Sequence, residues 1–288
     1  MTLTVLFCVD PLHLRRVDPH FSREAAAVAD HYGETALIDH DALRRGDVQD
    51  AVDAVPPGLG PVWYRGWMLS ADEYAAMAAT LKRRGTFLLT HPDDYRRAHE
   101  LPGWHDTFAG LTPHSVWRPL GTGQDPGDLS ELAELVRPLR PGPAVVKDYV
   151  KSCKHEWEEA CFVPDVKNPA KLHDIASKMV ALRDDHLAGG LVVREFEEYD
   201  EGEARVWWVD GEPALVGPHP DSPGVEPDPD LDAVAPAVRA LGCRFITTDL
   251  ARRTDGAWRV VEVGDGQVSD LPSSVDAMDL YAHLPVPD

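Results

Sequence analysis

Short apolar runs alternate with stretches whose apolar residues recur three or four positions apart over the first 90 residues of the chain. The runs predict strands at residues 2–8, 35–38, 62–64 and 86–89. The stretches between them predict helices at residues 22–32, 41–52 and 70–84, with Ser22 and Ser70 as N-caps. Strands that alternate with helices favour a mostly parallel α/β sheet.

The second half of the chain has a different pattern, in which short strands surround one long helix. Asn168 as N-cap and Pro169 at the first helical position open a helix that runs to about residue 186. A polar loop is expected from Lys147 to Glu159, and Asp210-Gly211 predicts a hairpin turn. Strands are predicted at residues 144–147, 191–197, 203–209 and 214–216, and a further helix at residues 231–241.

Two carboxylates on apolar strands near the C-terminus form the strongest chemical signal. Residues 245–250 and 258–263 predict paired strands joined by a turn at residues 254–256, and they carry Asp249 and Glu262. A carboxylate within a buried strand must be paired or bound to a cation. Oxygen ligands of this kind suit Mg²⁺. The alternative is a hairpin whose acids face water.

A lysine at the end of a buried strand gives a second candidate site. Lys147 follows the apolar residues 144–146 and opens a loop that contains Lys151, Ser152 and Lys154. An ammonium group at the end of a buried strand is costly unless it meets an anion, and phosphate is such an anion. The alternative is a solvated basic loop.

Composition limits the classes of function and the compartment. Hydrophobic residues make up 43% of the chain and charged residues 27%, which is typical of a soluble globular protein without a membrane segment. The net charge is −21, so extended binding to duplex nucleic acid is disfavoured, because phosphate contacts dominate that affinity. The spacing of the four cysteines matches no disulfide framework, and we expect free thiols in a cytoplasmic protein.

The order of the lysine strand, the acid-rich connector and the distal acidic pair resembles the ATP-grasp superfamily, in which two α+β lobes clasp ATP. The resemblance covers about residues 119–275. It implies an α/β N-terminal lobe followed by a two-lobed α+β ATP-grasp fold. The implied boundaries are residues 1–118 for the N-terminal domain, 119–190 for the first ATP-grasp lobe and 191–288 for the second.

The resemblance also implies cofactors and site residues. ATP and Mg²⁺ are the expected cofactors, with Lys147 and Arg205 as catalytic residues. The remaining residues divide into phosphate contacts (Lys147, Lys151, Ser152, Lys154), adenine contacts from the segment that contains Glu195, Phe196 and Glu197, a ribose contact (Glu203) and metal ligands (Asp249, Glu262).

One motif departs from the family pattern. The usual final motif is Glu-x-Asn, whereas this chain has Glu262-Val263-Gly264 followed by Asp265. Either Asp265 replaces the missing asparagine as a metal ligand or the metal keeps additional water. The departure also leaves open a weakened or altered catalyst.

Substrate contacts are expected from the first lobe, because open α/β sheets bind ligands beyond their strand ends. Arg65, His91, Arg15 and Arg16 all follow predicted strands. Each residue alone is more often a surface residue. Arg65 is the best candidate for a clamp on a substrate carboxylate or phosphate.

Three functions remain open. The first is an ATP-dependent ligase that joins the carboxylate of a small molecule or peptide to an amine through an acyl phosphate, releasing ADP and phosphate. The second is joining of RNA ends through an adenylylated intermediate, because residues 265–272 resemble a less-characterised branch of the superfamily for which that activity has been suggested. Overall acidity counts against it. The third is a non-catalytic nucleotide-binding module.

Overall fold

The computed structural model describes residues 3–31, 33–224 and 227–285, which form two compact units. Unit 1 draws its residues from Met1–His99, Gly202–Leu250 and Val263–Asp288. Unit 2 consists of Glu100–Glu201 and Ala251–Glu262. The three-part division at residues 118 and 190 stays a prediction.

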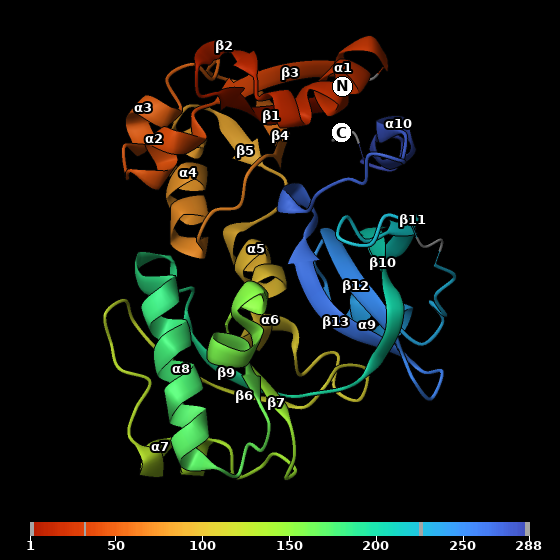
Figure 1. Cartoon of the computed structure of the whole chain (residues 1–288). Helices are drawn as coiled ribbons and strands as arrows, with labels where there is room; N and C mark the ends of the chain where they lie inside the picture. The colour runs from red at the N-terminus through yellow and green to blue at the C-terminus, as the bar shows by residue number, and fades with distance from the viewer. Residues whose placement is uncertain (1–2, 32, 225–226, 286–288) are drawn as a thin grey trace. The chain divides into compact units, whose positions relative to one another are not determined.

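A parallel sheet forms the base of unit 1 (Figure 1). Its strands are β1 (Leu3–Asp10), β3 (Gly33–Ile38), β4 (Gly60–Arg65) and β5 (Thr86–Leu88), and β1 pairs with both β3 and β4 in parallel. β1 is buried along nearly its whole length, as expected for a strand covered on both faces. The predicted parallel α/β sheet is therefore confirmed, but its antiparallel edge strand β2 (His13–Val17) was not predicted.

The helix predicted at residues 41–52 is wrong as a single element. The structure has two short helices there, α2 (His40–Arg44) and α3 (Val48–Ala51). Gly46 between them has a φ of 83°, which a helix cannot contain. Asp39 begins α2 by accepting a hydrogen bond from the Ala42 backbone N–H.

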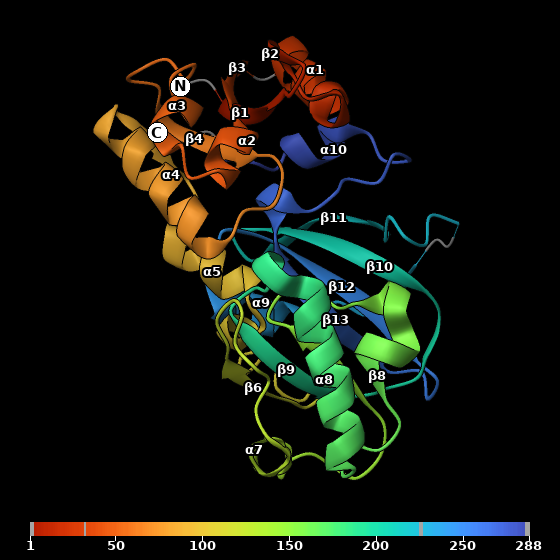
Figure 2. The ribbon, with the colours of Figure 1, turned by 60° about the vertical axis from the view of Figure 1, so that its left-hand side comes forward.

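The remaining helices of unit 1 follow local capping signals. Ser70 and Glu73 form a reciprocal capping box at the start of α4 (Ala71–Arg83), as the Ser70 N-cap predicted. Figure 2 shows α10 beside α1, in agreement with their contacts. The other helices are α1 (Ser22–His31), α5 (Pro92–His99), α9 (Ala235–Leu241) and α10 (Ala277–Tyr281), with the short turns η1 (Pro19–Phe21) and η5 (Gly266–Val268).

A second sheet has the strand order β11-β10-β12-β13. β10 and β11 are antiparallel and joined at Asp210-Gly211, where both residues have positive φ as the predicted hairpin turn requires. β12 lies next to β13, which confirms the predicted C-terminal strand pair. The bounds are β10 (Tyr199–Val209), β11 (Glu212–Pro218), β12 (Phe245–Arg253) and β13 (Trp258–Asp265).

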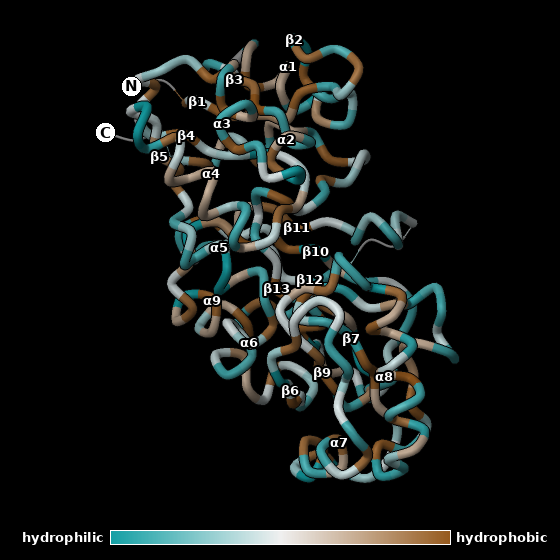
Figure 3. The backbone as a smooth tube through the Cα atoms, turned by 90° about the vertical axis from the view of Figure 1, so that its left-hand side faces the viewer, coloured by the Kyte–Doolittle hydropathy of each residue, from teal (hydrophilic) through white to brown (hydrophobic). Residues whose placement is uncertain are grey.

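Unit 2 is an antiparallel sheet with helices packed against it. The strand order is β6-β9-β7-β8, and the core lies between this sheet and the helices α7 and α8. α8 alternates between hydrophobic and hydrophilic residues, as Figure 3 shows. The bounds are β6 (Ser115–Pro119), α7 (Leu129–Leu135), β7 (Ala144–Asp148), β8 (Phe162–Val163), α8 (Pro169–Arg183) and β9 (Gly190–Glu195), and the short helix α6 (Leu101–Trp104) precedes them.

Two predictions for unit 2 need correction. The segment expected to be a polar loop as far as Glu159 contains the helical turns η2 (Lys154–Glu156) and η3 (Trp157–Cys161). The long helix begins at its predicted cap, where Asn168 accepts from the Lys171 N–H, but it ends at Arg183. Asp184 takes a φ of 39° there and starts the turn η4 (Asp184–His186). The end therefore comes before Gly189, the residue that predicted it.

Candidate functional site

Lys147 is buried near the end of β7, with an exposed fraction of 7%. Burial lowers the pKa of its ammonium group, while the negative charge of Glu262 acts in the opposite direction. Glu262 also interacts with the buried Arg194 guanidinium. One carboxylate of β13 is thus shared electrostatically by two buried cations of unit 2.

Asp148 holds the start of the lysine loop, and the sequence analysis did not identify it. Its side chain is fully buried. Oδ1 accepts from the backbone N–H groups of Val150 and Lys151 at 2.7 and 2.6 Å, and Oδ2 accepts from Arg183 Nε at 2.8 Å. The aspartate immediately after Lys147 therefore fixes the turn that leads into Lys151, Ser152 and Lys154.

Aromatic side chains connect the lysine loop to the segment after β9. The rings of Trp157 and Phe162 stack with centroids 5.3 Å apart. Phe196 packs against both, at 6.0 and 5.5 Å. The structure thus places Phe196, an expected adenine contact, beside the end of the loop that contains the expected phosphate contacts.

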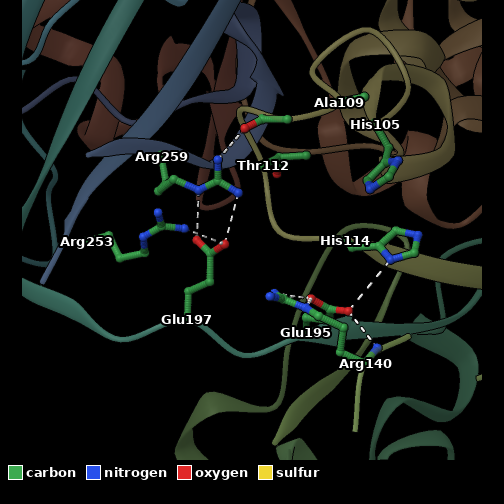
Figure 4. Close-up of a pocket in the computed structure, with 10 residues that line it drawn as sticks. His105, Ala109, Thr112, His114, Arg140, Glu195, Glu197, Arg253 and Arg259 are labelled. Atoms are coloured by element: carbon green, nitrogen blue, oxygen red, sulfur yellow. Dashed lines mark hydrogen bonds and ion pairs between the residues drawn. The ribbon is translucent and has the colours of Figure 1, made fainter. Parts of the chain in front are cut away.

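The carboxylates of Glu195 and Glu197 are both bound by arginines (Figure 4). Glu195 accepts from the backbone N–H and the side chain of Arg140, and these hydrogen bonds lower its pKa although burial would raise it. Glu197 accepts from Arg259 Nε and Nη2, each at 2.9 Å, and from Arg253 Nη1 at 3.4 Å. The sequence analysis missed these arginines because each is distant in the chain from its glutamate.

Arg205 and Asp249 form a two-pronged ion pair between β10 and β12 in unit 1. Nε and Nη2 of Arg205 donate to the two oxygens of Asp249 at 2.8 and 2.9 Å. Burial would raise the pKa of Asp249, but the guanidinium charge holds it well below its usual range. The expected catalytic arginine and an expected metal ligand are therefore direct partners, whereas the other expected metal acids do not share this contact.

His219 is a further residue at this pair that the sequence analysis missed. Its Nε2 lies 2.8 Å from Arg205 Nη2 and 3.5 Å from Asp249 Oδ2. The backbone N–H of Asp221 donates to its Nδ1 at 3.1 Å. The only local signal is its position in Pro218-His219-Pro220, directly after a predicted strand. Glu203, the expected ribose contact, lies on β10 and accepts a backbone hydrogen bond from His219.

Asp265 is fully buried at the end of β13. Its Oδ1 accepts from the backbone and side-chain nitrogens of Gln267, each at 2.9 Å, and burial raises its pKa to about 7. Oδ2 has no hydrogen-bond partner within the described part of the chain. Protonation of this oxygen would remove the cost of burying a charge.

The fit of Mg²⁺ to these acids is partial. Their carboxylate oxygens are the ligand type that Mg²⁺ prefers. Asp249, however, already has a guanidinium on both oxygens, and Asp265 is bound into its own turn. Across residues 3–31, 33–224 and 227–285, no three His, Cys, Asp or Glu side chains are grouped so that they could hold a metal ion. The donor chemistry fits, and an assembled metal site is not present.

The expected substrate residues do not form one cluster. Arg65 is 2% exposed and donates to both oxygens of Glu24, at 2.6 and 2.9 Å. Arg15 and Arg16 are exposed on β2. The side chain of His91 is 69% exposed and lies 3.4 Å from Asp93. Arg65 is therefore in the core of unit 1, whereas the other three are on its surface.

A comparison with protein-family models decides the identity of this fold. The model of an ATP-grasp domain, the third family of its clade, matches residues 136–284. The chain belongs to this ATP-grasp family. Membership supports an ATP-dependent enzyme, with ligation as the general activity. A comparison with curated protein sequences gives no match.

Solved structures agree with this ATP-grasp assignment at the level of the fold. A RimK domain ATP-grasp protein from Sphaerobacter thermophilus is 17% identical with a TM-score of 0.61, covering 97% of this chain and 98% of that chain. The D-cycloserine synthetase DcsG is 17% identical with a TM-score of 0.63, covering 96% and 97%. D-alanine–D-alanine ligase from Bacillus anthracis is 14% identical with a TM-score of 0.57, covering 98% and 97%. The predicted fold class is confirmed.

The structure also gives a physical account of the departure at Gly264 in this ATP-grasp chain. A Cβ atom at Gly264 would lie 3.1 Å from Thr247 Oγ1 and 3.3 Å from Ser269 Oγ. These two hydroxyl groups are hydrogen-bonded to each other at 2.8 Å. The space into which an asparagine side chain would extend is thus occupied by a hydroxyl pair. Among the described residues, no helix is long and apolar enough to cross a membrane.

Proposed function

We propose that this ATP-grasp protein is an ATP- and Mg²⁺-dependent ligase that joins a carboxylate to an amine. ATP phosphorylates the carboxylate oxygen and leaves as ADP. The amine then attacks the acyl phosphate and phosphate departs. The observation that carries the proposal is the buried Lys147 at the start of a lysine loop, in a chain of the ATP-grasp family.

Unit 2 supplies the expected nucleotide contacts. Lys147 and the loop residues Lys151, Ser152 and Lys154 would neutralise and orient the phosphates. The stacked Trp157 and Phe162, together with Phe196, offer apolar ring surface suited to a flat purine. Adenine would hydrogen-bond to the backbone of the segment containing Glu195, Phe196 and Glu197.

Unit 1 supplies the expected charge on the transferring group. The planar guanidinium of Arg205 suits a phosphoryl group, and Glu203 on the same strand would bind the ribose. Asp249, Glu262 and Asp265 are the acids proposed to hold Mg²⁺, which when bound neutralises phosphate charge. Because Asp249 is already paired with Arg205, metal binding and phosphate binding would compete for the same ion pair.

The substrate is proposed to be a small-molecule or peptide carboxylate with an amine partner. The printed names of similar structures include a D-cycloserine synthetase, a D-alanine–D-alanine ligase and the ligase PsnB complexed with a minimal precursor. Arg15, Arg16 and His91 are exposed and remain candidate substrate contacts. Arg65 remains a candidate through its place at the end of β4, although Glu24 already neutralises its charge.

Substrate-stimulated release of ADP tests this proposal. The full chain with Mg²⁺ and ATP is incubated with mixtures of carboxylates and amines, and ADP, AMP, phosphate and pyrophosphate are quantified. We expect ADP and phosphate in equal amounts, and a loss of turnover in Lys147→Met. Lys178→Met, an exposed lysine on α8 in the same unit, is the matched control and keeps its activity. AMP with pyrophosphate would instead support RNA-end joining, and ATP binding without products would support a nucleotide-binding module.

A further inference from the structure

A cavity of about 510 Å³ lies within unit 2, beside the side chains of Glu195 and Glu197. Its volume is in the range of small-molecule sites, which is about 300–1,000 Å³. Its lining does not include Lys147 or the loop residues Lys151, Ser152 and Lys154. The cavity is therefore separate from the residues proposed to contact ATP phosphates.

The two carboxylates in the cavity wall are saturated with donors. Glu195 Oε1 accepts from the Arg140 backbone N–H and lies 3.7 Å from His114 Nδ1, and Oε2 accepts from the Arg140 guanidinium. Both oxygens of Glu197 accept from Arg259, and Tyr199 Oη donates to Oε2 at 3.2 Å. Since each oxygen already has its donors, the wall offers little to a metal ion or an ammonium group.

Positive charge exceeds negative charge in the cavity wall. Three guanidinium groups, from Arg140, Arg253 and Arg259, face two carboxylates, in a chain whose net charge is −21. Arg140 uses Nε and Nη2 for Glu195, and no partner of its Nη1 is found in the described part of the chain. An exposed guanidinium edge held in place by a carboxylate is a preformed donor for a carboxylate or phosphate ligand.

His105 supplies a hydrogen-bond acceptor to the same cavity. The residue is 7% exposed, and its Nδ1 lies 3.2 Å from Asp106 Oδ1. A carboxylate at Nδ1 favours the ring proton on that nitrogen, which leaves Nε2 as a lone-pair acceptor. Burial lowers the pKa of His105, which keeps the ring neutral. Within the described residues Nε2 has no hydrogen-bond partner, and its ring faces the space between His114 and Thr112 (Figure 4).

We propose that this cavity binds a small organic anion. Its carboxylate or phosphate group lies against Arg140 and His114, and a hydroxyl or amine hydrogen of the same molecule is donated to His105 Nε2. The bound donor satisfies a buried acceptor whose desolvation otherwise goes uncompensated. This proposal does not depend on ATP binding, and it is tested with no nucleotide present.

The test uses the full chain and three probes, titrated separately and followed by ¹H–¹⁵N spectra of the histidine rings. L-Malate carries carboxylates and a hydroxyl donor, succinate lacks the hydroxyl, and inorganic phosphate replaces the carboxylate. We expect saturable shifts of the His105 and His114 signals with malate or phosphate, and weaker binding of succinate than of malate. Saturation by malate assigns a carboxylate ligand, and saturation by phosphate alone assigns a phosphate ligand.

Matched variants test whether binding occurs in the cavity. Arg140→Met should weaken the tighter probe at least about tenfold, because it removes the charged donor. Arg137→Met changes an exposed arginine three residues away that pairs with Glu134 and does not line the cavity, and it should leave binding unchanged. His105→Phe keeps a ring and should abolish the preference for malate over succinate.

Two results would overturn the proposal. One is the absence of saturation by malate and by phosphate up to about 10 mM in the unmutated protein. The other is equal weakening by Arg137→Met and Arg140→Met, which would show non-specific attraction. The unmutated titration is decisive even if Arg140→Met does not fold.

Discussion

Unit 1 contains two buried pairs of arginine and carboxylate that have the same geometry and different surroundings. In each pair the guanidinium donates to both carboxylate oxygens, in Arg65–Glu24 and in Arg205–Asp249. The side chains of the first pair are 2% and 5% exposed, and those of the second are 11% and 6% exposed.

The surroundings of the first pair close it off. Tyr281 Oη donates to Glu24 at 2.8 Å, and the rings of Phe21 and Trp207 each lie 5.4 Å from the Arg65 guanidinium carbon. The pair thus replaces apolar packing inside a core, and its charges have no access to a ligand.

The second pair is bordered by a group that can change its partner. His219 contacts both members, and it lies where β11 gives way to the loop that follows. An ion pair bordered by a histidine and a loop can be opened by a bound phosphate or metal, whereas one enclosed by aromatic rings cannot. Pair geometry alone therefore does not distinguish a structural arginine from a functional one.

The largest expected effect comes from removing charge in the enclosed pair. Glu24→Gln should lower the free energy of unfolding by about 3–5 kcal/mol, because Arg65 is left as an uncompensated buried charge. Urea denaturation measures the change. Glu212→Gln, which breaks an exposed pair with Arg239, is the control and should cost less than about 1 kcal/mol. A small effect of Glu24→Gln would mean that water or another group compensates Arg65.

The next prediction compares two buried aspartates through pH. The pKa of Asp265 is raised to about 7 in the folded protein, against about 3.9 in an unfolded chain. The folded state then holds an extra proton between these values, so this group lowers stability as pH rises from about 4 to about 7. Asp265→Asn should remove that decline, which is ~4 kcal/mol at most.

Asp249 should show the opposite dependence. Its folded pKa is depressed by Arg205, so its contribution to stability is present above the unfolded pKa of about 3.9 and is lost as pH falls through the folded pKa. Urea titrations of unmutated protein, Asp249→Asn and Asp265→Asn from pH 3 to pH 8 in EDTA measure both trends. Parallel curves for the two variants would contradict the difference between the aspartates.

A smaller effect, on rate and not on folding, is expected at the open pair. Arg205→Lys should lower turnover by at least about tenfold, or roughly 1.4 kcal/mol of barrier, because a lysine does not reproduce the planar fork. ATP binding should change little, and initial rates of ADP release measure the loss. Arg252→Lys, an exposed arginine on the neighbouring strand β12, is the control. Equal activity of both variants would give Arg205 the same structural role as Arg65.

The smallest effect is expected from restoring the asparagine that the family motif contains. Gly264→Asn should destabilise the protein by about 1–3 kcal/mol, because its Cβ would press on the hydroxyls of Thr247 and Ser269. Ser269→Ala in the same chain should recover part of this loss by removing one of the two oxygens. Thermal unfolding of the single and double variants measures it. A gain in stability from Gly264→Asn alone would show that the hydroxyl pair moves aside freely.

Features encoded by neighbouring residues were predictable from the sequence. The capping box at Ser70, the turn at Asp210-Gly211 and the lysine at the end of β7 each depend on a few adjacent positions. The interruption at Gly46 was missed because apolar residues on both sides of it kept a helical spacing. The turns η2 and η3 were missed because a polar, charged stretch carries no periodic signal.

By itself the sequence determined the strand lysine, the acids of β12 and β13 and the order in which they occur, because local alternation and turn residues fix such elements. Only the tertiary structure decided that Arg65 binds Glu24, that Arg205 binds Asp249 and that Arg140 binds Glu195. These partners are 41, 44 and 55 residues apart. Strand register and packing bring them together, and a guanidinium has the same sequence signature whether a ligand or a buried carboxylate neutralises it.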